Sequence, residues 1–438
     1  MNQAWVVAVD MGYGHQRAAH PFRHIAYERI ITANSDKVVL PDEQRRWRTL
    51  QGLYEGVSRL STIPVVGPML WRAYDRLQAI QPRYPFRDLS KPSLGSMRLS
   101  RLIERGLAAG ISEYSRKRED LPLLSTFFAV ALAADHAGRR NVFCVVTDSD
   151  INRIWVARKP AGSRVVYLAP TIASRDRLRQ YGVPDEHIFL TGFPLPQENV
   201  DKAAEDLRRR LTTLDPTGSF HDKFREMLGP GTAAPRDGAQ RPLTVAYAVG
   251  GAGAQAKIAH DILSSLTPRL REGSMRAHLI AGTRLEVNRY FQQIVRELSL
   301  EPELGRSVHI LCALSKPEYF EQFNRMLRET DVLWTKPSEL VFYSALGIPI
   351  IMAPPLGAHE ERNRDSLRQV GAGQVQEDPR AAVEWLTEWT RNGLLANTAF
   401  SGFVHSLRHG TENIIRLLFA ADPARVALRS NRDAASQG

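Results

Sequence analysis

Residues 5–15 read WVVAVDMGYGH, a valine-rich apolar run that ends in a turn with two glycines. Residues 243–255, LTVAYAVGGAGAQ, repeat this arrangement in the second half of the chain. Sequence compatible with a helix follows each stretch. A buried strand that passes through a glycine-rich turn into a helix is typical of doubly wound parallel sheets. The two stretches therefore predict two α/β domains of this class.

Further apolar runs, separated by helix-like segments, extend both predicted sheets. Such alternation is typical of a parallel sheet covered by helices on both faces. Ligands of these sheets bind at the carboxyl ends of the strands, so two facing domains are expected to form a cleft. The additional strand candidates are residues 141–148, 164–168, 188–191, 278–282, 308–312, 331–335 and 348–352.

The domain boundary is expected at residues 229–238, GPGTAAPRDG, which read as a flexible linker. We predict an N-terminal domain at 1–235, a C-terminal domain at 243–418 and a flexible tail at 419–438. The N-terminus lacks the pattern of a signal peptide. Glycine and prolines interrupt the longest apolar run, residues 340–356, so we expect no spanning helix and a cytosolic protein.

The chain is basic, with 58 Lys and Arg residues against 47 Asp and Glu and a net charge of +11. Such a balance suits nucleotides, nucleic acid or an acidic membrane face. Residues 42–120 hold fifteen basic and nine acidic residues, interleaved with apolar and aromatic ones. This pattern fits either a membrane-interface insertion or a helical hairpin packed on the first domain. No basic, base-stacking stripe lies elsewhere, so we expect no nucleic-acid partner.

The first glycine turn is the candidate acceptor-side loop. Gly12 and Gly14 let backbone N–H groups approach an oxyanion at the start of a helix. The turn is not a dinucleotide fingerprint, because Arg17 stands where a third glycine is needed, and it lacks a P-loop ending. His15 suits a general base or a hydrogen-bond donor, and Asp148 is the second candidate base. The simpler interpretation is a tight turn capped by histidine.

Three later segments suit a donor nucleotide and its sugar. In the second glycine turn, as in the first, backbone N–H groups can approach an oxyanion. Thr335–Leu340 follows a strand and has the residue types that begin a helix. Residues 357–363 gather side chains that hydrogen-bond sugar hydroxyls. The alternative for the last two segments is two ordinary helix caps. The predicted donor-binding residues are Gly250, Gly251, Gly253, Lys336, Ser338, Glu339, Gly357, His359, Glu360 and Asn363.

We expect neither a metal ion nor a cofactor. Asp148-Ser149-Asp150 spells D-x-D, which can hold a divalent cation against a diphosphate, but three letters occur often by chance. Cys144 and Cys312 are the two cysteines of the chain, too few for a disulfide framework or a four-thiolate zinc site.

With these residues in place, the sequence resembles the GT-B glycosyltransferases that act on lipid acceptors. The resemblance rests on the Asp-x-Gly-x-Gly-His order at 10–15, on the strand into Thr147-Asp148, and on GVPDEHIFLTGFP at 182–194. The nearest groups are the monogalactosyldiacylglycerol synthases and the peptidoglycan lipid-intermediate N-acetylglucosaminyltransferase. The similarity extends from Val6 to about Leu418.

The resemblance implies a GT-B fold, in which two Rossmann-like domains face a cleft that holds a nucleotide-sugar. It implies that the first glycine turn serves the acceptor and catalysis, and that the second faces the donor diphosphate. The family's Gly-Gln-Glu-x-x-Asn pattern for the donor sugar matches residues 357–363, with His359 in place of glutamine. Phe342 stands where the family has an acidic residue for the ribose hydroxyls, and Glu339 is the substitute one turn earlier.

We therefore expect an inverting, metal-independent hexosyltransferase. Its partners are a nucleoside-diphosphate sugar, a hydroxyl acceptor on a lipid, and an anionic membrane surface met by residues 42–120, with the protein on the cytoplasmic side of the inner membrane. Two alternatives remain: a nucleotide-sugar epimerase or hydrolase on the same fold, and a non-catalytic nucleotide-sugar-binding protein.

Overall fold

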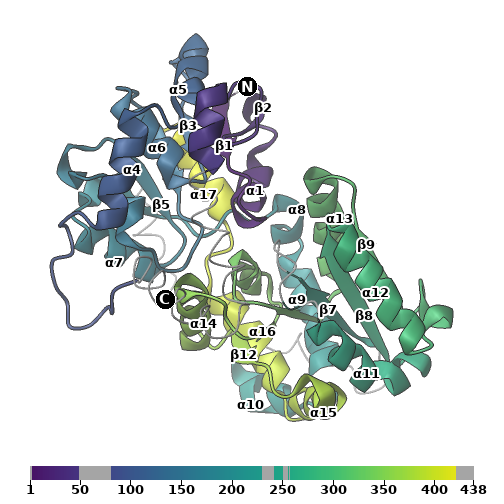
Figure 1. The fold of residues 1–438 in the computed structure, drawn as a ribbon. Coiled ribbons are helices and arrows are strands. Elements are labelled where there is room, and N and C mark those ends of the chain that lie inside the picture. The colour runs from purple at the N-terminus through teal and green to yellow at the C-terminus, as the bar shows by residue number, and fades with distance from the viewer. Residues whose placement is uncertain (1, 49–79, 229–240, 250–254, 256, 421–438) are drawn as a thin grey trace, which may run out of the picture. The chain divides into compact units, whose positions relative to one another are not determined.

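The computed structural model describes residues 2–48, 80–228, 241–249, 255 and 257–420. The chain divides into two compact units, each with one six-stranded sheet (Figure 1). The first unit comprises residues 1–195, 357–362 and 409–438, and the second comprises 196–356 and 363–408. All ten strand pairings within the two sheets are parallel, which confirms the predicted doubly wound α/β class.

The first sheet has the strand order β2-β1-β3-β4-β5-β6. Both of its faces are buried, because alternate residues of its first strand belong to two different apolar clusters: Trp5 and Val7 to one, Ala4 and Val6 to the other. Its strands are β1 (Ala4–Ala8), β2 (Ala26–Thr32), β3 (Leu123–Ser125), β4 (Val142–Val145), β5 (Val166–Ala169) and β6 (Ile188–Leu190).

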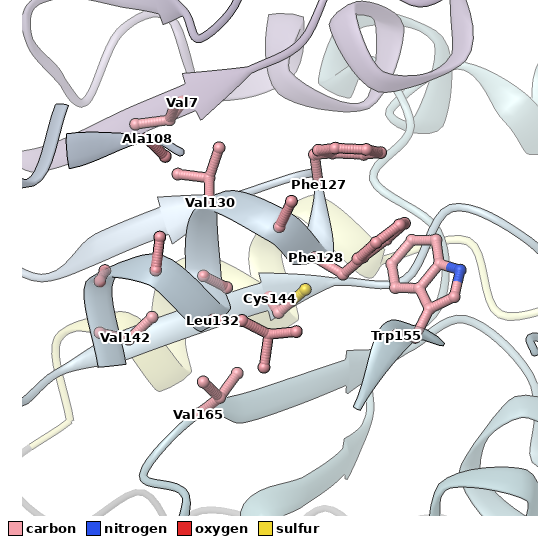
Figure 2. Packing of buried hydrophobic residues seen from close by; sticks show 14 of the residues in the cluster. Val7, Ala108, Phe127, Phe128, Val130, Leu132, Val142, Cys144, Trp155 and Val165 are labelled. Carbon is pink, nitrogen blue, oxygen red and sulfur yellow. The ribbon is translucent and has the colours of Figure 1, made fainter. Parts of the chain in front are cut away.

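The larger apolar cluster of this unit lies between the sheet and helix α6 (Phe128–His136), which is buried along seven successive residues. Figure 2 shows this helix over the strand that carries Cys144, with Phe128 directed at Trp155; the two ring centroids are 4.9 Å apart. Complete burial raises the pKa of the Cys144 thiol. The other helices of the unit are α1 (Gly14–Ala19), α4 (Leu94–Glu104), α5 (Ala109–Tyr114), α7 (Ile172–Gln180) and α17 (Gly410–Leu418).

The second sheet has the strand order β12-β11-β10-β7-β8-β9. Its strands are β7 (Leu243–Ala248), β8 (Met275–Gly282), β9 (Val308–Cys312), β10 (Val332–Thr335), β11 (Ile350–Met352) and β12 (Gly373–Val375). The α-helices of the second unit are α8 (Gln197–Val200), α9 (Ala203–Leu214), α10 (Ser219–Leu228), α11 (Ile258–Arg271), α12 (Leu285–Glu297), α13 (Lys316–Glu329), α15 (Ala382–Arg391) and α16 (Leu394–His405), and a 3₁₀ helix, η7, spans Glu339–Leu346. Helix α14 (Ala358–Gln369) begins in residues of the first unit and continues into the second after residue 362.

The boundary between the two units differs from the one that the sequence indicated. The division lies between Leu195 and Pro196, well before the linker at 229–238, which lies outside the described residues. Helices α9 and α10 belong to the second unit because their apolar side chains, such as Leu207, join its core. Helix α17 returns to the first unit (Figure 1), and its Ile414 belongs to the apolar cluster that also contains Ala4, Val6 and Ala8 of β1.

The basic segment at 42–120 is not one uniform insertion. Residues 49–79, with most of its apolar stretch, lie outside the described residues. Residues 94–118 form α4, α5 and a short 3₁₀ helix, and apolar side chains such as Leu99 and Ile111 are buried in the core of the first unit. This part of the segment is therefore a helical layer of the domain. In the described part of the chain, no helix is long and apolar enough to cross a membrane.

A buried arginine holds η7 in place. Arg210 of α9 is 1% exposed and donates to three main-chain carbonyls: Leu327 at 2.9 Å, Thr330 at 2.7 Å and Leu346 at 2.9 Å. The first two acceptors lie at the end of α13 and the third ends η7, where carbonyls lack partners within their own helix. Burial lowers the pKa of Arg210 to about 10, so the side chain stays charged at neutral pH.

Two histidines face each other across the edge of the second sheet. His278 on β8 is in register with His309 on β9, and their rings meet edge to face with centroids 5.2 Å apart. Burial, helped by His309 and Arg276, lowers the pKa of His278 from 6.5 to about 3. The folded protein therefore keeps this imidazole neutral over the range in which an exposed histidine takes up a proton.

This burial predicts an acid sensitivity that replacement of His278 should remove. Below a pH of about 6.5 the unfolded chain binds one more proton than the folded one, so folding stability falls by about 1.4 kcal/mol per pH unit down to the folded pKa. We expect His278→Leu to gain on the wild type by that slope between about pH 6.5 and 4.5, as measured by urea unfolding. Burial raises the pKa of Asp331, which gives the opposite slope in both proteins and cancels in the comparison. Parallel stability curves would contradict the prediction.

Candidate functional site

The first glycine turn lies at the switch point of the first sheet. Strand β1 has β2 on one side and β3 on the other, so the chain order reverses beside it. Parallel sheets bind their ligands at this point, beyond the carboxyl ends of the strands. Helix α1 begins at Gly14, and Gly12 has φ +89°, a conformation that favours glycine. Gly12, Gly14 and His15 are therefore placed where the sequence predicted a ligand.

His15 connects the two strands on either side of the switch point. Its Nδ1 lies 2.6 Å from the carbonyl oxygen of Thr126, which follows β3, and the Thr126 hydroxyl donates back to the His15 carbonyl at 2.8 Å. Its ring packs edge to face on Phe127, with centroids 5.0 Å apart. A carbonyl oxygen only accepts hydrogen bonds, so Nδ1 carries the hydrogen and Nε2 carries the lone pair of the neutral ring.

Asp148 lies close in the chain to the same site. Thr147, which precedes it after β4, places its hydroxyl 3.5 Å from Nδ1 of His15. The second acid of the D-x-D sequence is engaged elsewhere: Arg177 donates to both carboxylate oxygens of Asp150, each at 2.8 Å, and both side chains are buried. Over the described ranges, no group of three or more His, Cys, Asp or Glu residues is arranged to hold a metal ion.

Strand β7, which precedes the second glycine turn in the chain, lies at the switch point of the second sheet, between β10 and β8. Gly250, Gly251 and Gly253 lie outside the described residues. Gln255, at the end of the turn, accepts a hydrogen bond from the Tyr247 hydroxyl at 2.6 Å and donates to the Pro354 carbonyl at 2.5 Å. Gln255 thereby links strand β7 to the loop after β11.

The segment after β10 forms a 3₁₀ helix where the sequence indicated the start of an α-helix. Lys336 and Ser338 lie in the turn after β10, and Ser338 is extended before η7 begins at Glu339. Within η7, Glu339 and Phe342 are partly exposed, while the remaining six residues are buried. Residues three apart eclipse each other on a 3₁₀ helix, so Glu339 and Phe342 lie on one face. The sequence singled out Glu339 but did not assign a binding role to Phe342.

The predicted sugar-binding residues follow β11, the neighbour of β10. Helix α14 begins one residue after Gly357, and Glu360 and Asn363 are buried one helical turn apart. The side chain of His359 is 51% exposed, and its Nε2 lies 4.0 Å from a carboxylate oxygen of Glu360. The structure therefore groups Glu360 with Asn363 and leaves His359 at the surface.

Comparisons with known proteins bear on the fold. A family model described as a domain of unknown function, DUF6938, matches residues 291–399. The comparison with curated proteins gave no match. Among solved structures, S. aureus MnaA in a co-structure with UDP is 10% identical, with a TM-score of 0.50 and 95% of each chain covered.

Two further solved structures show the same breadth of coverage. A Listeria monocytogenes protein assigned as a UDP-N-acetylglucosamine 2-epimerase is 11% identical, with a TM-score of 0.50 and coverage of 95% of this chain and 96% of that one. Acinetobacter baumannii MurG is 13% identical, with a TM-score of 0.46 and coverage of 95% and 99%. At these identities the likeness concerns the fold. Together with the two parallel six-stranded sheets, it shows that this chain has the GT-B fold.

Proposed function

We propose that this chain is an enzyme that transfers a hexose from a nucleoside-diphosphate sugar to a hydroxyl acceptor, with inversion and without a metal ion. The observation that carries the proposal is the pairing of His15 with Thr126 at the switch point of the first sheet. This pairing leaves the basic lone pair on Nε2 of a ring whose orientation is fixed, which is what a general base requires.

The proposed reaction is a single displacement. Nε2 of His15 takes the proton of the acceptor hydroxyl while its oxygen bonds to the anomeric carbon of the sugar. The bond from that carbon to the diphosphate breaks, and its electron pair leaves with the nucleoside diphosphate. Backbone N–H groups of the 335–339 turn and the ammonium of Lys336 are the groups we assign to the negative charge on the leaving group. Asp148 is the alternative base.

The metal-independent form of the proposal is supported by the state of the D-x-D sequence. A diphosphate-bound cation in such a motif takes carboxylate oxygens as ligands. Both oxygens of Asp150 accept hydrogen bonds from the buried guanidinium of Arg177, so this acid serves to hold the loop after β4. The leaving-group charge is then assigned to fixed backbone dipoles and Lys336.

Nucleoside recognition is assigned to the exposed face of η7. A carboxylate that accepts hydrogen bonds from ribose hydroxyls contributes about 1.5–3 kcal/mol, so we expect Glu339→Gln to weaken UDP binding by about 10-fold or more. Isothermal titration calorimetry measures the effect. Binding of inorganic pyrophosphate, which has no ribose, should be unchanged, as should UDP binding to the control Glu301→Gln, an exposed acid of the same unit. An equal loss of pyrophosphate binding would contradict the ribose assignment.

The acceptor hydroxyl is proposed to belong to a lipid, so that the enzyme works at the cytoplasmic face of an anionic membrane. The basic, apolar character of residues 42–120 supports this assignment. A second candidate function, a nucleotide-sugar epimerase or hydrolase, is favoured by the two solved structures named for UDP and for a 2-epimerase.

One experiment separates these functions. The purified protein is incubated with a series of nucleoside-diphosphate sugars, first alone and then with lipid vesicles that present hydroxyl acceptors. Release of nucleoside diphosphate that requires vesicles, together with a glycosylated lipid, supports the transferase. A new sugar isomer or free sugar without vesicles supports the second candidate. Saturable donor binding with no product in either case would overturn both and indicate a binding protein.

A further inference from the structure

The 3₁₀ helix η7 is longer than most helices of its kind. It spans eight residues, Glu339–Leu346, whereas runs of more than three or four residues are uncommon because their hydrogen bonds are poorly aligned. A run of this length needs support from its surroundings, and 3₁₀ segments of this kind often mark a functional or strained part of a protein. The contacts that hold η7, and the side chains that it leaves at the surface, show what this geometry achieves.

Close contacts from three helices of the second unit hold η7. Arg210 of α9 donates to the last carbonyl of η7 at 2.9 Å. A methyl group at Gly402 of α16 would lie 2.6 Å from the carbonyl oxygen of Ser344, so the two backbones touch and only glycine fits there. The Tyr343 ring packs edge to face on Phe323 of α13, with centroids 5.9 Å apart. Helix η7 is therefore a preorganised support for the side chains on its outer face.

The 3₁₀ geometry aligns the two side chains of η7 that reach the surface. Residues three apart eclipse each other on a 3₁₀ helix and are separated by about 6 Å along its axis, so Glu339 and Phe342 stand one above the other. In an α-helix the same pair would be rotated apart by about 60°. Both side chains are partly exposed, and the other six residues of η7 are buried. The outer face of η7 thus consists of one carboxylate and one aromatic ring.

The order of these groups along the chain matches the order of the parts of a nucleotide. Lys336, in the turn before η7, carries the ammonium assigned to the diphosphate, and Glu339 follows three residues later with the carboxylate assigned to the ribose. In a nucleoside diphosphate the base is attached to the ribose on the side away from the phosphates. Phe342 is the next outward side chain after Glu339, and bases stack on aromatic rings whatever hydrogen-bonding groups their edges carry.

We propose that Phe342 is the stacking platform for the nucleobase of the donor. The inference rests on the proposed function, because it uses the assignment of Lys336 to the diphosphate and of Glu339 to the ribose. Stacking recognises the flat face of a base, so Phe342 favours nucleotides over sugar phosphates without selecting one base. It also explains why an aromatic residue stands where the family that the sequence resembles has an acid: the ribose contact lies one 3₁₀ turn earlier, at Glu339.

The test measures binding of separate parts of a nucleotide to the full chain by isothermal titration calorimetry. The nucleotide is whichever of UDP, CDP, ADP and GDP the wild type binds most tightly, and ribose 5-phosphate and inorganic pyrophosphate are the ligands without a base. Phe342→Ala and Phe342→Leu should bind the nucleotide about 5- to 100-fold more weakly, because both lose the aromatic face although leucine keeps much of the apolar volume. Binding of the two ligands without a base should not change. Phe342→Tyr keeps the aromatic face and should bind the nucleotide as the wild type does.

The matched control is Phe224→Ala, which removes another partly exposed phenylalanine of the second unit, on α10. It should bind the nucleotide like the wild type, and thermal unfolding should show every variant folded. Wild-type nucleotide affinity in Phe342→Leu would overturn the inference and leave the proposed transferase standing. An equal loss for ribose 5-phosphate would show general damage to η7 and would also overturn it. So would a loss seen only with a nucleoside-diphosphate hexose, which assigns the ring to the transferred sugar. Absence of nucleotide binding by the wild type would overturn the donor assignments and the inference together.

Discussion

Replacement of His15 by alanine is expected to lower kcat for sugar transfer by about 10²–10⁴-fold while nucleotide binding stays within about twofold of the wild type. The variant removes the lone pair that would accept the acceptor proton, whereas the residues assigned to the donor follow β7, β10 and β11 of the second sheet. Steady-state kinetics measure the first quantity and calorimetry with UDP measures the second. Unchanged turnover would remove His15 from the mechanism.

Two further variants sharpen this prediction. His15→Gln keeps an amide that can donate to the Thr126 carbonyl but has no basic nitrogen, so it should be as inactive as alanine although the local structure is retained. His24→Ala replaces an exposed histidine that lies beyond the first turn, and it should keep full activity. Recovery of activity in His15→Gln would assign the histidine a purely structural role.

Arg210→Met is expected to cost about 3–5 kcal/mol of folding stability, because it leaves three buried carbonyls without their shared donor. The methionine retains much of the apolar stem, so the loss reflects the hydrogen bonds rather than a large cavity. Urea unfolding should show a lower midpoint with an unchanged denaturant slope. A destabilisation below about 1 kcal/mol would contradict this account.

The control for this variant lies on the same helix. Arg208→Met removes an exposed arginine two residues earlier and should change stability by less than about 0.5 kcal/mol. The Arg210 effect should also reach the nucleotide, since Leu346 ends the helix that carries Glu339 and Phe342. At a temperature where Arg210→Met is fully folded, we expect weaker UDP binding together with unchanged pyrophosphate binding.

The strands that could be predicted from the sequence are those whose residues form a continuous apolar run. Strand β9 matches its prediction at 308–312. Strand β2 was not predicted because it is an edge strand with Glu28 and Arg29 in its middle, so it lacks a continuous apolar run. Strands β3 and β12 were also not predicted. Strand β3 is followed after two residues by the apolar helix α6, so the two read as one apolar stretch, and β12 has a single large apolar side chain among its three residues.

Those candidate-site residues that belong to short local turn motifs could be predicted from the sequence. The glycine turns and the residues after β10 and β11 stand out locally, and the observed strand order places β1 at the switch point of the first sheet and β7 and β10 at that of the second. The contacts that orient them are not local: Thr126 is 111 residues from His15, and Leu346 is 136 residues from Arg210. The unit to which α9 belongs is equally hidden, since an amphipathic pattern shows that a helix has an apolar face but not which sheet it covers.

The return of α17 to the first unit determines the order in which the two units can complete folding during synthesis. Domains usually fold as they emerge, with the N-terminal one first. Here Ile414, Leu417 and Leu418 complete a cluster that also holds Ala4, Val6 and Ala8, so β1 awaits residues that are synthesised after the whole second sheet. The second unit can assemble while the first is still unfinished. A nascent chain stalled shortly before α17 would thus expose the apolar face of the first sheet that α17 covers. Exposed apolar surface of this kind recruits chaperones.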